Sequence, residues 1–204
     1  MSAVAYIGRF SRTERALHWI HASAFLVLLG SGLVLYLPSL AAAVGRRPLV
    51  KEVHLATALL WAVALVAVVA VGDRRGLRRT LRELDRFDED DRRWLRGGRT
   101  PQGRFNAGQK LNASLTAAFA LLFAVSGLLL WLGERDTRFR WDSTIVLHDV
   151  LTLLSLGLLC GHLYLAVIHP STRHALRGMT LGNVREDWAR EHHTKWAARD
   201  FSDS

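Results

Sequence analysis

The chain has 204 residues, of which 50% are apolar, and its mean hydropathy is positive, as expected of a small integral membrane protein. The lone Cys160 excludes a disulfide framework, and the absence of a C-x-x-C-H motif excludes covalently attached c-type haem. The formal net charge of +9 is concentrated at the borders of apolar runs, so it indicates membrane topology and anionic lipid rather than nucleic acid.

Four apolar runs are each long enough to cross a bilayer as a helix. They cover residues 16–37, 53–71, 111–132 and 145–168. A polar connection covers residues 73–104, and a polar tail covers residues 171–204. The pattern predicts an all-α membrane protein with a single domain over residues 1–204, built as a four-transmembrane-helix bundle.

Lysine and arginine residues are distributed unevenly around these runs. The segments before the first run, between the second and third, and after the fourth carry 21 of them, whereas the other two connections carry six. Cytoplasmic segments of membrane proteins are enriched in these residues. We therefore expect both termini and the 73–104 connection in the cytoplasm.

The first two helices have recognisable start and stop signals. Ser11-Arg12-Thr13-Glu14 has the form of a capping box, so the first helix is expected to begin there and to carry His18 near its cytoplasmic end. Pro48 can occupy the first turn of the second helix, and Gly72 can cap its last turn. His54 then lies near the outer end of the second span.

The connection over residues 73–104 contains leucines at helical spacing, namely Leu77, Leu81 and Leu84, followed by a Gly97-Gly98 break. This pattern predicts one or two short amphipathic helices on the cytoplasmic interface. A solvated loop with many salt bridges is the alternative.

The third run contains no histidine and follows the segment Phe105–Lys110, which reads FNAGQK. Asn106, Gly108 and Gln109 place amide groups and accessible backbone at the cytoplasmic boundary. They either form a site or merely begin a helix.

The fourth run carries His148 and His162, which are 14 residues apart. This separation is close to four helical turns, so both side chains lie on nearly one face, at levels that differ by ~21 Å. Histidines within a membrane span are costly and usually functional, although a single one can serve only to hydrogen-bond a neighbouring helix.

The tail contains a polar helix candidate over residues 183–198, with Trp188 and Trp196. His192 and His193 are expected to be solvated or interfacial, and His174 likewise.

Depth arranges four histidines in two pairs. His54 and His148 lie near the outer surface, and His18 and His162 lie near the cytoplasmic surface. Zinc would require four ligands at one point, and non-haem iron would require a carboxylate within the bundle, of which the spans supply almost none. Two stacked haems b with histidine ligands fit best, although a proton pathway through the histidines is possible.

Several segments of the chain resemble the gamma subunit of respiratory formate dehydrogenase, a membrane cytochrome b. FNAGQK and the tail are specific to this subunit type, whereas cytochromes b of hydrogenases and thiosulfate-type reductases share the general plan. The matching segments are Arg15–Trp19, Val53-His54, Phe105–Lys110, Leu147-His148, His162-Leu163-Tyr164, Gly178-Met179 and Trp188–Trp196.

The resemblance implies that His54 and His148 ligate the iron of the outer haem, and that His18 and His162 ligate that of the inner haem. It also implies a menaquinone site beside the inner haem, lined by Asn106, Gly108 and Gln109. The family often has proline where this chain has Leu55, which should alter the local helix more than the ligation. His21 and His169 are alternative inner ligands.

The implied function is electron transfer from an iron–sulfur beta subunit on the outer face, through two haems b, to menaquinone near the cytoplasm. The chain would be the quinone-reducing subunit of an oxidoreductase complex, and formate would be oxidised in a separate molybdenum or tungsten alpha subunit. Alternatives are the cytochrome b subunit of another quinone-linked oxidoreductase, such as a membrane-bound hydrogenase, and a haem-free anchor or proton-conducting protein.

Overall fold

The structure is a computed structural model that describes residues 4–200. The chain forms two compact units. The polar unit comprises the residues up to 15, residues 73–117 and the residues from 160 onwards, and the span unit comprises residues 16–72 and 118–159.

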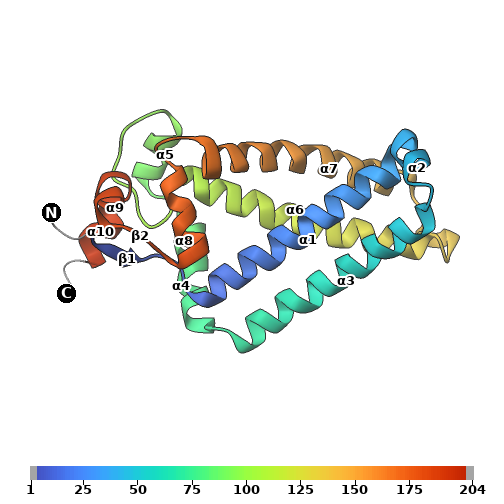
Figure 1. Ribbon diagram of the computed structural model, residues 1–204, viewed down its shortest axis with the longest axis horizontal. Coiled ribbons are helices and arrows are strands. Elements are labelled where there is room, and N and C mark those ends of the chain that lie inside the picture. The colour runs from blue at the N-terminus through green and yellow to red at the C-terminus, as the bar shows by residue number, and fades with distance from the viewer. Residues whose placement is uncertain (1–3, 201–204) are drawn as a thin grey trace. The chain divides into compact units, whose positions relative to one another are not determined.

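Four long helices account for the predicted spans (Figure 1). They are α1 (Arg12–Tyr36), α3 (Arg47–Val71), α6 (Ala107–Gly133) and α7 (Asp142–Leu163), the last continued by the π-helical turn η2 (Tyr164–Ile168). All four are long and apolar enough to cross a membrane. Each helix begins a few residues before its apolar run.

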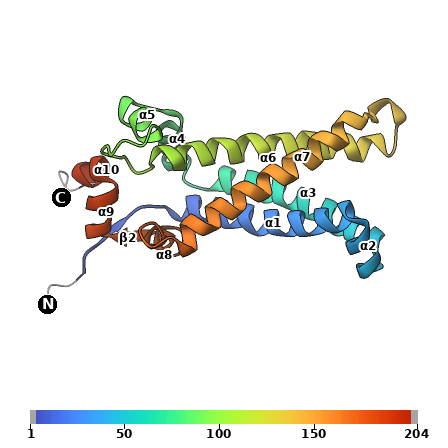
Figure 2. The same cartoon turned by 90° about the horizontal axis from the view of Figure 1, so that it is seen from above.

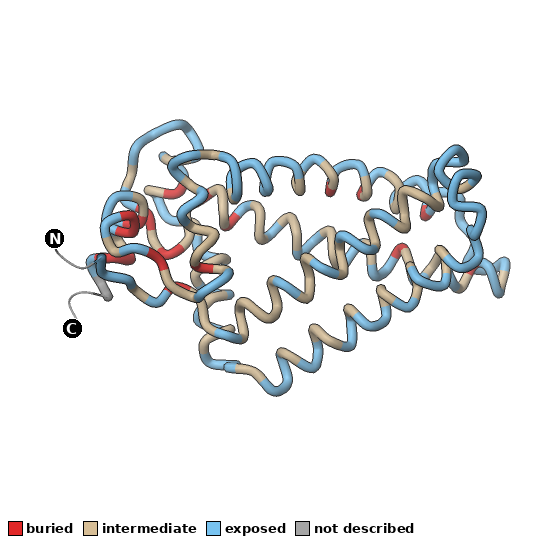
Figure 3. The backbone as a smooth tube through the Cα atoms, in the orientation of Figure 1, coloured by how far each residue is buried: buried red, intermediate tan, exposed pale blue. Residues whose placement is uncertain are grey.

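The long helices of the span unit expose apolar side chains. Neither α1 nor α3 contains a buried residue, and Leu59, Val66 and Val71 are 67%, 70% and 88% exposed. Figure 3 accordingly shows exposed and half-buried backbone along most of these helices. Helices that are apolar on all faces suit a lipid environment, where such side chains contact acyl chains.

The predicted start and stop signals of the first two spans are confirmed. The Ser11 backbone N–H donates to Glu14 Oε2 at 2.7 Å, and the Glu14 N–H donates to Ser11 Oγ at 3.2 Å, which completes a capping box. Pro48 lies in the first turn of α3, and Gly72 caps its end. A short helix that the sequence did not predict, α2 (Pro38–Val44), connects α1 to α3.

One or two short helices were predicted after α3, and the structure has two, α4 (Arg74–Asp85), which contains the spaced leucines, and α5 (Glu89–Leu95). Asp88 begins α5 through a second capping box, with Asp91. Gly97 follows with a φ of +87°, a conformation that glycine adopts without steric cost.

The tail differs from the single helix predicted over residues 183–198. Residues Asn183–Arg185 form strand β2, which pairs antiparallel with β1 (Tyr6–Gly8), with Ile7 opposite Val184. Figure 2 shows β2 between the short helices of the tail. The remaining tail elements are η3 (Arg173–Ala175), α8 (Leu176–Leu181), α9 (Glu186–His192) and α10 (Thr194–Asp200); a further 3-10 turn, η1 (Thr137–Phe139), precedes α7.

A small apolar core holds this part of the polar unit together. It consists of Val184, Trp188, Ala189 and Trp196, with Ile7 and Ala175 packed against it. The helix prediction was wrong over Asn183–Arg185 because pairing with β1 satisfies that backbone instead.

Candidate functional site

His54 of α3 and His148 of α7 lie side by side in the span unit. Their ring centroids are 6.5 Å apart, and the ring planes are inclined by 64°. Both residues lie in the N-terminal part of their helix, close to the short connections over residues 37–46 and 134–141. The sequence predicted these two histidines at one depth, and the structure places their rings next to each other.

Each of the two rings is held by a serine from a neighbouring helix. His54 Nδ1 is 2.8 Å from Ser31 Oγ of α1, and His148 Nδ1 is 2.8 Å from Ser126 Oγ of α6. The Nε2 atom of each ring is therefore the nitrogen that remains for a ligand. Sequence reasoning identified neither serine as the partner of a histidine, since a serine inside an apolar run is commonly bonded only to its own helix.

A glycine follows each serine and admits the ring to the helix surface. A Cβ atom at Gly32 would lie 3.5 Å from His54 Cε1, and one at Gly127 would lie 3.7 Å from His148 Cε1. The edge of His148 also contacts Phe123, at a centroid distance of 5.1 Å. The two imidazoles are thus packed on several sides by the helices that present them.

The spacing of the rings fits two axial ligands of one metal atom. Imidazole nitrogen–metal bonds are about 2.0–2.1 Å long, so two imidazoles on opposite sides of one metal have ring centroids about 6 Å apart. The observed separation of 6.5 Å is close to this value. The described residues include no group of three or more His, Cys, Asp or Glu side chains arranged for a metal ion, whereas a haem iron needs only two protein ligands.

The other predicted pair, His18 and His162, is distributed over the two units. His18 of α1 is half-buried, and its ring meets Trp19 edge-on at 5.2 Å. His162 occupies the last turn of α7, directly before the π-helical turn Tyr164–Ile168. Such turns occur frequently at functional sites. The pairing of His18 with His162 stays a prediction.

His21 and His169, the alternative inner ligands, both have local contacts. His21 stacks on Phe25 at 6.1 Å and lies 5.8 Å from Trp61, whose buried Nε1 has no hydrogen-bond acceptor among the described residues. The His169 backbone N–H donates to the Tyr164 carbonyl at 2.9 Å and closes the π-helical turn.

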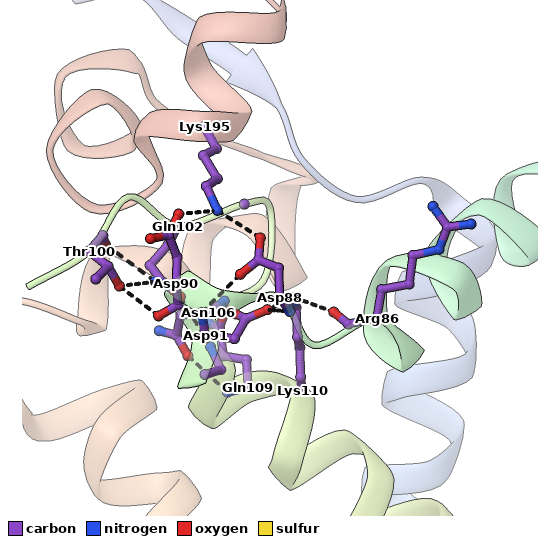
Figure 4. Close-up of polar contacts among 12 residues, drawn as sticks. Arg86, Asp88, Asp90, Asp91, Thr100, Gln102, Asn106, Gln109, Lys110 and Lys195 are labelled. Carbon is purple, nitrogen blue, oxygen red and sulfur yellow. Dashed lines mark hydrogen bonds and ion pairs between the residues drawn. The ribbon is translucent and has the colours of Figure 1, made fainter. Parts of the chain in front are cut away.

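Asn106 and Gln109 begin α6 with a reciprocal pair of hydrogen bonds in the polar unit (Figure 4). The Gln109 N–H donates to Asn106 Oδ1 at 2.8 Å, and the Asn106 N–H donates to Gln109 Oε1 at 3.1 Å. The helix-start interpretation of this segment is therefore confirmed. Gly108 admits the Trp94 indole, because a Cβ atom there would lie 3.0 Å from Trp94 Cη2.

A buried arginine, Arg9, contacts the Gln109 side chain. Its Nη2 donates to the Arg104 carbonyl at 2.8 Å, to His193 Nε2 at 3.1 Å and to Gln109 Oε1 at 3.3 Å. Burial, together with the nearby Arg104 charge, lowers the pKa of Arg9 to about 9. The guanidinium is packed among aromatic rings, at 5.1 Å from Phe10 and 5.3 Å from Trp188.

The expectation that His193 is solvated or interfacial was wrong. Its side chain is only 2% exposed, and its Nδ1–H donates to the Gly103 carbonyl at 2.6 Å. Burial, followed by repulsion from Arg9, lowers the pKa of His193 to about 3, so the ring is neutral and can accept from Arg9. His192 is half-buried and stacks on Trp188 at 5.1 Å, and His174 lies by the Arg173–Ala175 turn.

Ion pairs hold the remaining segments of the polar unit around the start of α6. Lys110 Nζ lies 2.6 Å from Asp91 Oδ2, and both side chains are nearly buried (Figure 4). Arg104 pairs with Glu14 at 2.8 Å and with Glu83 at 2.7 Å. The positive charges of Arg104 and Lys110, at the two ends of the segment 104–110, are thus neutralised by acids from other elements of the polar unit.

The chain resembles known proteins over most of its length. Residues 9–182 match the family described as prokaryotic cytochrome b561. The formate dehydrogenase cytochrome b556(fdo) subunit of Escherichia coli K12 is 24% identical over 204 residues, covering 93% of this chain and 91% of that protein. The nitrate-inducible cytochrome b556(Fdn) subunit of the same strain is 21% identical, covering 96% and 92%. The formate dehydrogenase cytochrome b556 subunit of Haemophilus influenzae is 22% identical, covering 92% and 81%.

Proposed function

Because the chain belongs to the prokaryotic cytochrome b561 family, we propose that it is the cytochrome b subunit of a formate dehydrogenase complex. Three relatives named for that subunit align with nearly the whole chain, which supports a shared role for the full bundle. A molybdenum or tungsten alpha subunit oxidises formate, and an iron–sulfur beta subunit passes the electrons to this chain. The chain has no formate-oxidising site of its own.

The observation that carries the proposal is the facing pair of imidazoles from α3 and α7, with ring centroids 6.5 Å apart. We assign His54 and His148 as axial ligands of an outer haem b, and His18 and His162 as those of an inner haem b. A haem b with two histidine ligands supplies one-electron transfer and leaves no open position for oxygen. Ser31 and Ser126 bond Nδ1 of the two outer histidines, so Nε2 would be the nitrogen of each ring that binds the iron.

The proposed electron acceptor is menaquinone, bound near the cytoplasmic side beside Asn106, Gly108 and Gln109. Gln109 Oε1 already accepts hydrogen bonds from the Asn106 N–H and from Arg9, so the amide Nε2–H is the group that can donate to a quinone oxygen. Trp94, which lies against Gly108, supplies an apolar wall of the kind that quinone rings contact.

The prokaryotic family supports a bacterial inner-membrane location, and the distribution of lysine and arginine supports an orientation with both termini in the cytoplasm. In this orientation the beta subunit docks on the outer face, near His54 and His148. Electrons then cross the membrane inwards, while protons for quinol formation are taken from the cytoplasm, so charge is separated without a proton channel.

The first test is the haem content of the purified protein. We expect two haems b per chain in a pyridine haemochrome assay, both low-spin in a reduced-minus-oxidised spectrum. A ratio near one or zero contradicts the two histidine pairs. Co-purification with a formate-oxidising subunit supports the assigned complex, whereas co-purification with a hydrogenase subunit assigns the chain to the other quinone-linked oxidoreductases that share this plan.

A further inference from the structure

The span unit holds its two facing histidines in two similar ways. In one half, α1 presents Ser31-Gly32 to His54 of α3, and the serine and histidine are 23 residues apart. In the other half, α6 presents Ser126-Gly127 to His148 of α7, at a separation of 22 residues. Both Oγ–Nδ1 distances are 2.8 Å, so a serine hydroxyl lies at the same atom of each ring, and His54 has a further hydrogen bond with the Leu28 backbone.

The second contact of each serine determines which atom donates. Ser31 Oγ lies 2.7 Å from the Val27 carbonyl, and Ser126 Oγ lies 2.7 Å from the Leu122 carbonyl. A carbonyl oxygen has no proton, so the single hydroxyl proton of each serine is donated to it. Each Oγ must then accept from the imidazole, which places the ring proton on Nδ1 and the lone pair on Nε2.

We propose that Ser31 and Ser126 are positioning residues of the outer haem, which fix the tautomer and orientation of its two axial imidazoles. The inference rests on the proposed function, because it assigns His54 and His148 as ligands. Partners of the second ring nitrogen generally raise the basicity of a metal-bound imidazole and hold its plane. Each serine hydroxyl donates a hydrogen bond to a backbone carbonyl. This bond polarises the hydroxyl and makes its oxygen a stronger acceptor.

Gly32 and Gly127, which follow the two serines, lie beside the same two rings. Each forms part of the surface against which a ring lies, since a Cβ atom at either position would be in ordinary van der Waals contact with the ring Cε1. The two rings, each held at Nδ1 by a serine, have planes inclined by 64°. Axial imidazoles with strongly inclined planes give a low-spin ferric haem with a highly anisotropic EPR signal.

The test compares Ser31→Ala, Ser126→Ala and the double variant with the wild-type complex in native membranes. A more basic imidazole favours ferric iron, and removal of a serine makes its imidazole less basic. We therefore expect the midpoint potential of the outer haem to rise in each single variant. The potential of the inner haem should not change. Loss of such outer partners typically weakens metal retention by about 10- to 100-fold, so the double variant should lose much of its outer haem.

Ser114→Ala is the matched control, because Ser114 Oγ also donates to a carbonyl four residues earlier in α6, that of Lys110, at 3.0 Å. It should leave both potentials and both EPR signals unchanged. Ser31→Thr keeps a hydroxyl and should restore wild-type values, which separates the hydrogen bond from a packing effect. If Ser31→Ala does not accumulate, Ser126→Ala tests the other ligand independently.

Two haems with unchanged potentials and EPR signals in Ser31→Ala and Ser126→Ala would overturn the role of the serines and leave the proposed function standing. A wild-type protein without haem would instead overturn the proposed function, and this inference with it.

Discussion

Gln109 has two roles that substitutions can separate at the scale of a single residue. Its Oε1 accepts from the Asn106 N–H and from Arg9, which begins α6 and fastens that turn. Its Nε2–H is the group proposed to bind the quinone. A change that keeps the oxygen but removes the amide hydrogens should therefore affect only the second role.

We expect Gln109→Glu to keep both haems and the start of α6 while lowering quinone turnover by roughly 5- to 100-fold. Losing one hydrogen bond costs ~1 kcal/mol, or up to ~3 if a buried partner is stranded, and ~1.4 kcal/mol corresponds to a factor of ten. Quinol production by the purified complex measures the effect. Gln109→Leu removes both roles, so it should lower turnover at least as much. Normal turnover in Gln109→Glu would restrict this residue to helix capping.

The assignment of His54 makes a prediction about one haem only. His54→Ala should remove the outer haem and block electron input from the iron–sulfur partner, whereas added quinol should still reduce the inner haem. Redox-difference spectra with formate and with quinol as reductants distinguish these routes. His174→Ala is the control, since His174 lies in the tail. Retention of both haems in His54→Ala would show that this residue is not an axial ligand.

At the scale of elements, His193 lies between α9 and α10 and connects the tail to the loop that leads into α6. It donates to the Gly103 carbonyl and accepts from Arg9, while Trp188 and Trp196 pack around it. Both hydrogen bonds require a neutral ring with its proton on Nδ1. Protonation would place a second buried cation beside the Arg9 guanidinium.

This arrangement predicts a pH dependence of stability. The folded-state pKa of His193 lies at about 3, below the ordinary value of 6.5, so the unfolded chain binds more protons at intermediate pH. The stabilising contribution is fully present above pH 6.5 and is lost as the pH falls towards 3. Thermal unfolding followed by tryptophan fluorescence at pH 7.5 and 5.0 should show a smaller acid-induced decrease in Tm for His193→Gln than for wild type. His174→Gln should behave as wild type, and an equal decrease in all three proteins would refute the role of His193.

At the scale of the whole molecule, the single cysteine makes the topology directly testable. In a Cys160→Ala background, we expect a cysteine at Thr137, between α6 and α7, to react with a membrane-impermeant maleimide in intact spheroplasts. A cysteine at Arg99, between α5 and α6, should react only after the membrane is permeabilised, because the arginine-rich connections are retained in the cytoplasm. Both sites are exposed, so a reversed labelling pattern would show a reversed orientation.

The features that were correctly predicted from the sequence depend on residues close together in the chain. Hydropathy over about 20 residues identified α1, α3, α6 and α7, and the Ser11–Glu14 capping box placed the start of α1. Burial of a continuous apolar helix in lipid needs no particular partner, so composition alone indicates it. The pairing of His54 with His148 was predicted from their positions in two such helices, and their rings lie 6.5 Å apart in the structure.

Other features were decided only by the tertiary structure, because their partners are far apart in the chain. Arg9 and His193 are 184 residues apart, and β1 pairs with β2 across nearly the whole chain. The residues next to His193 in the sequence do not indicate that it is buried. Its burial depends on the Gly103 carbonyl, which accepts a hydrogen bond from the ring. Ser31 and Ser126 likewise resemble ordinary serines that bond to their own helix, and they acquire a second role only because packing brings His54 and His148 to their hydroxyl groups.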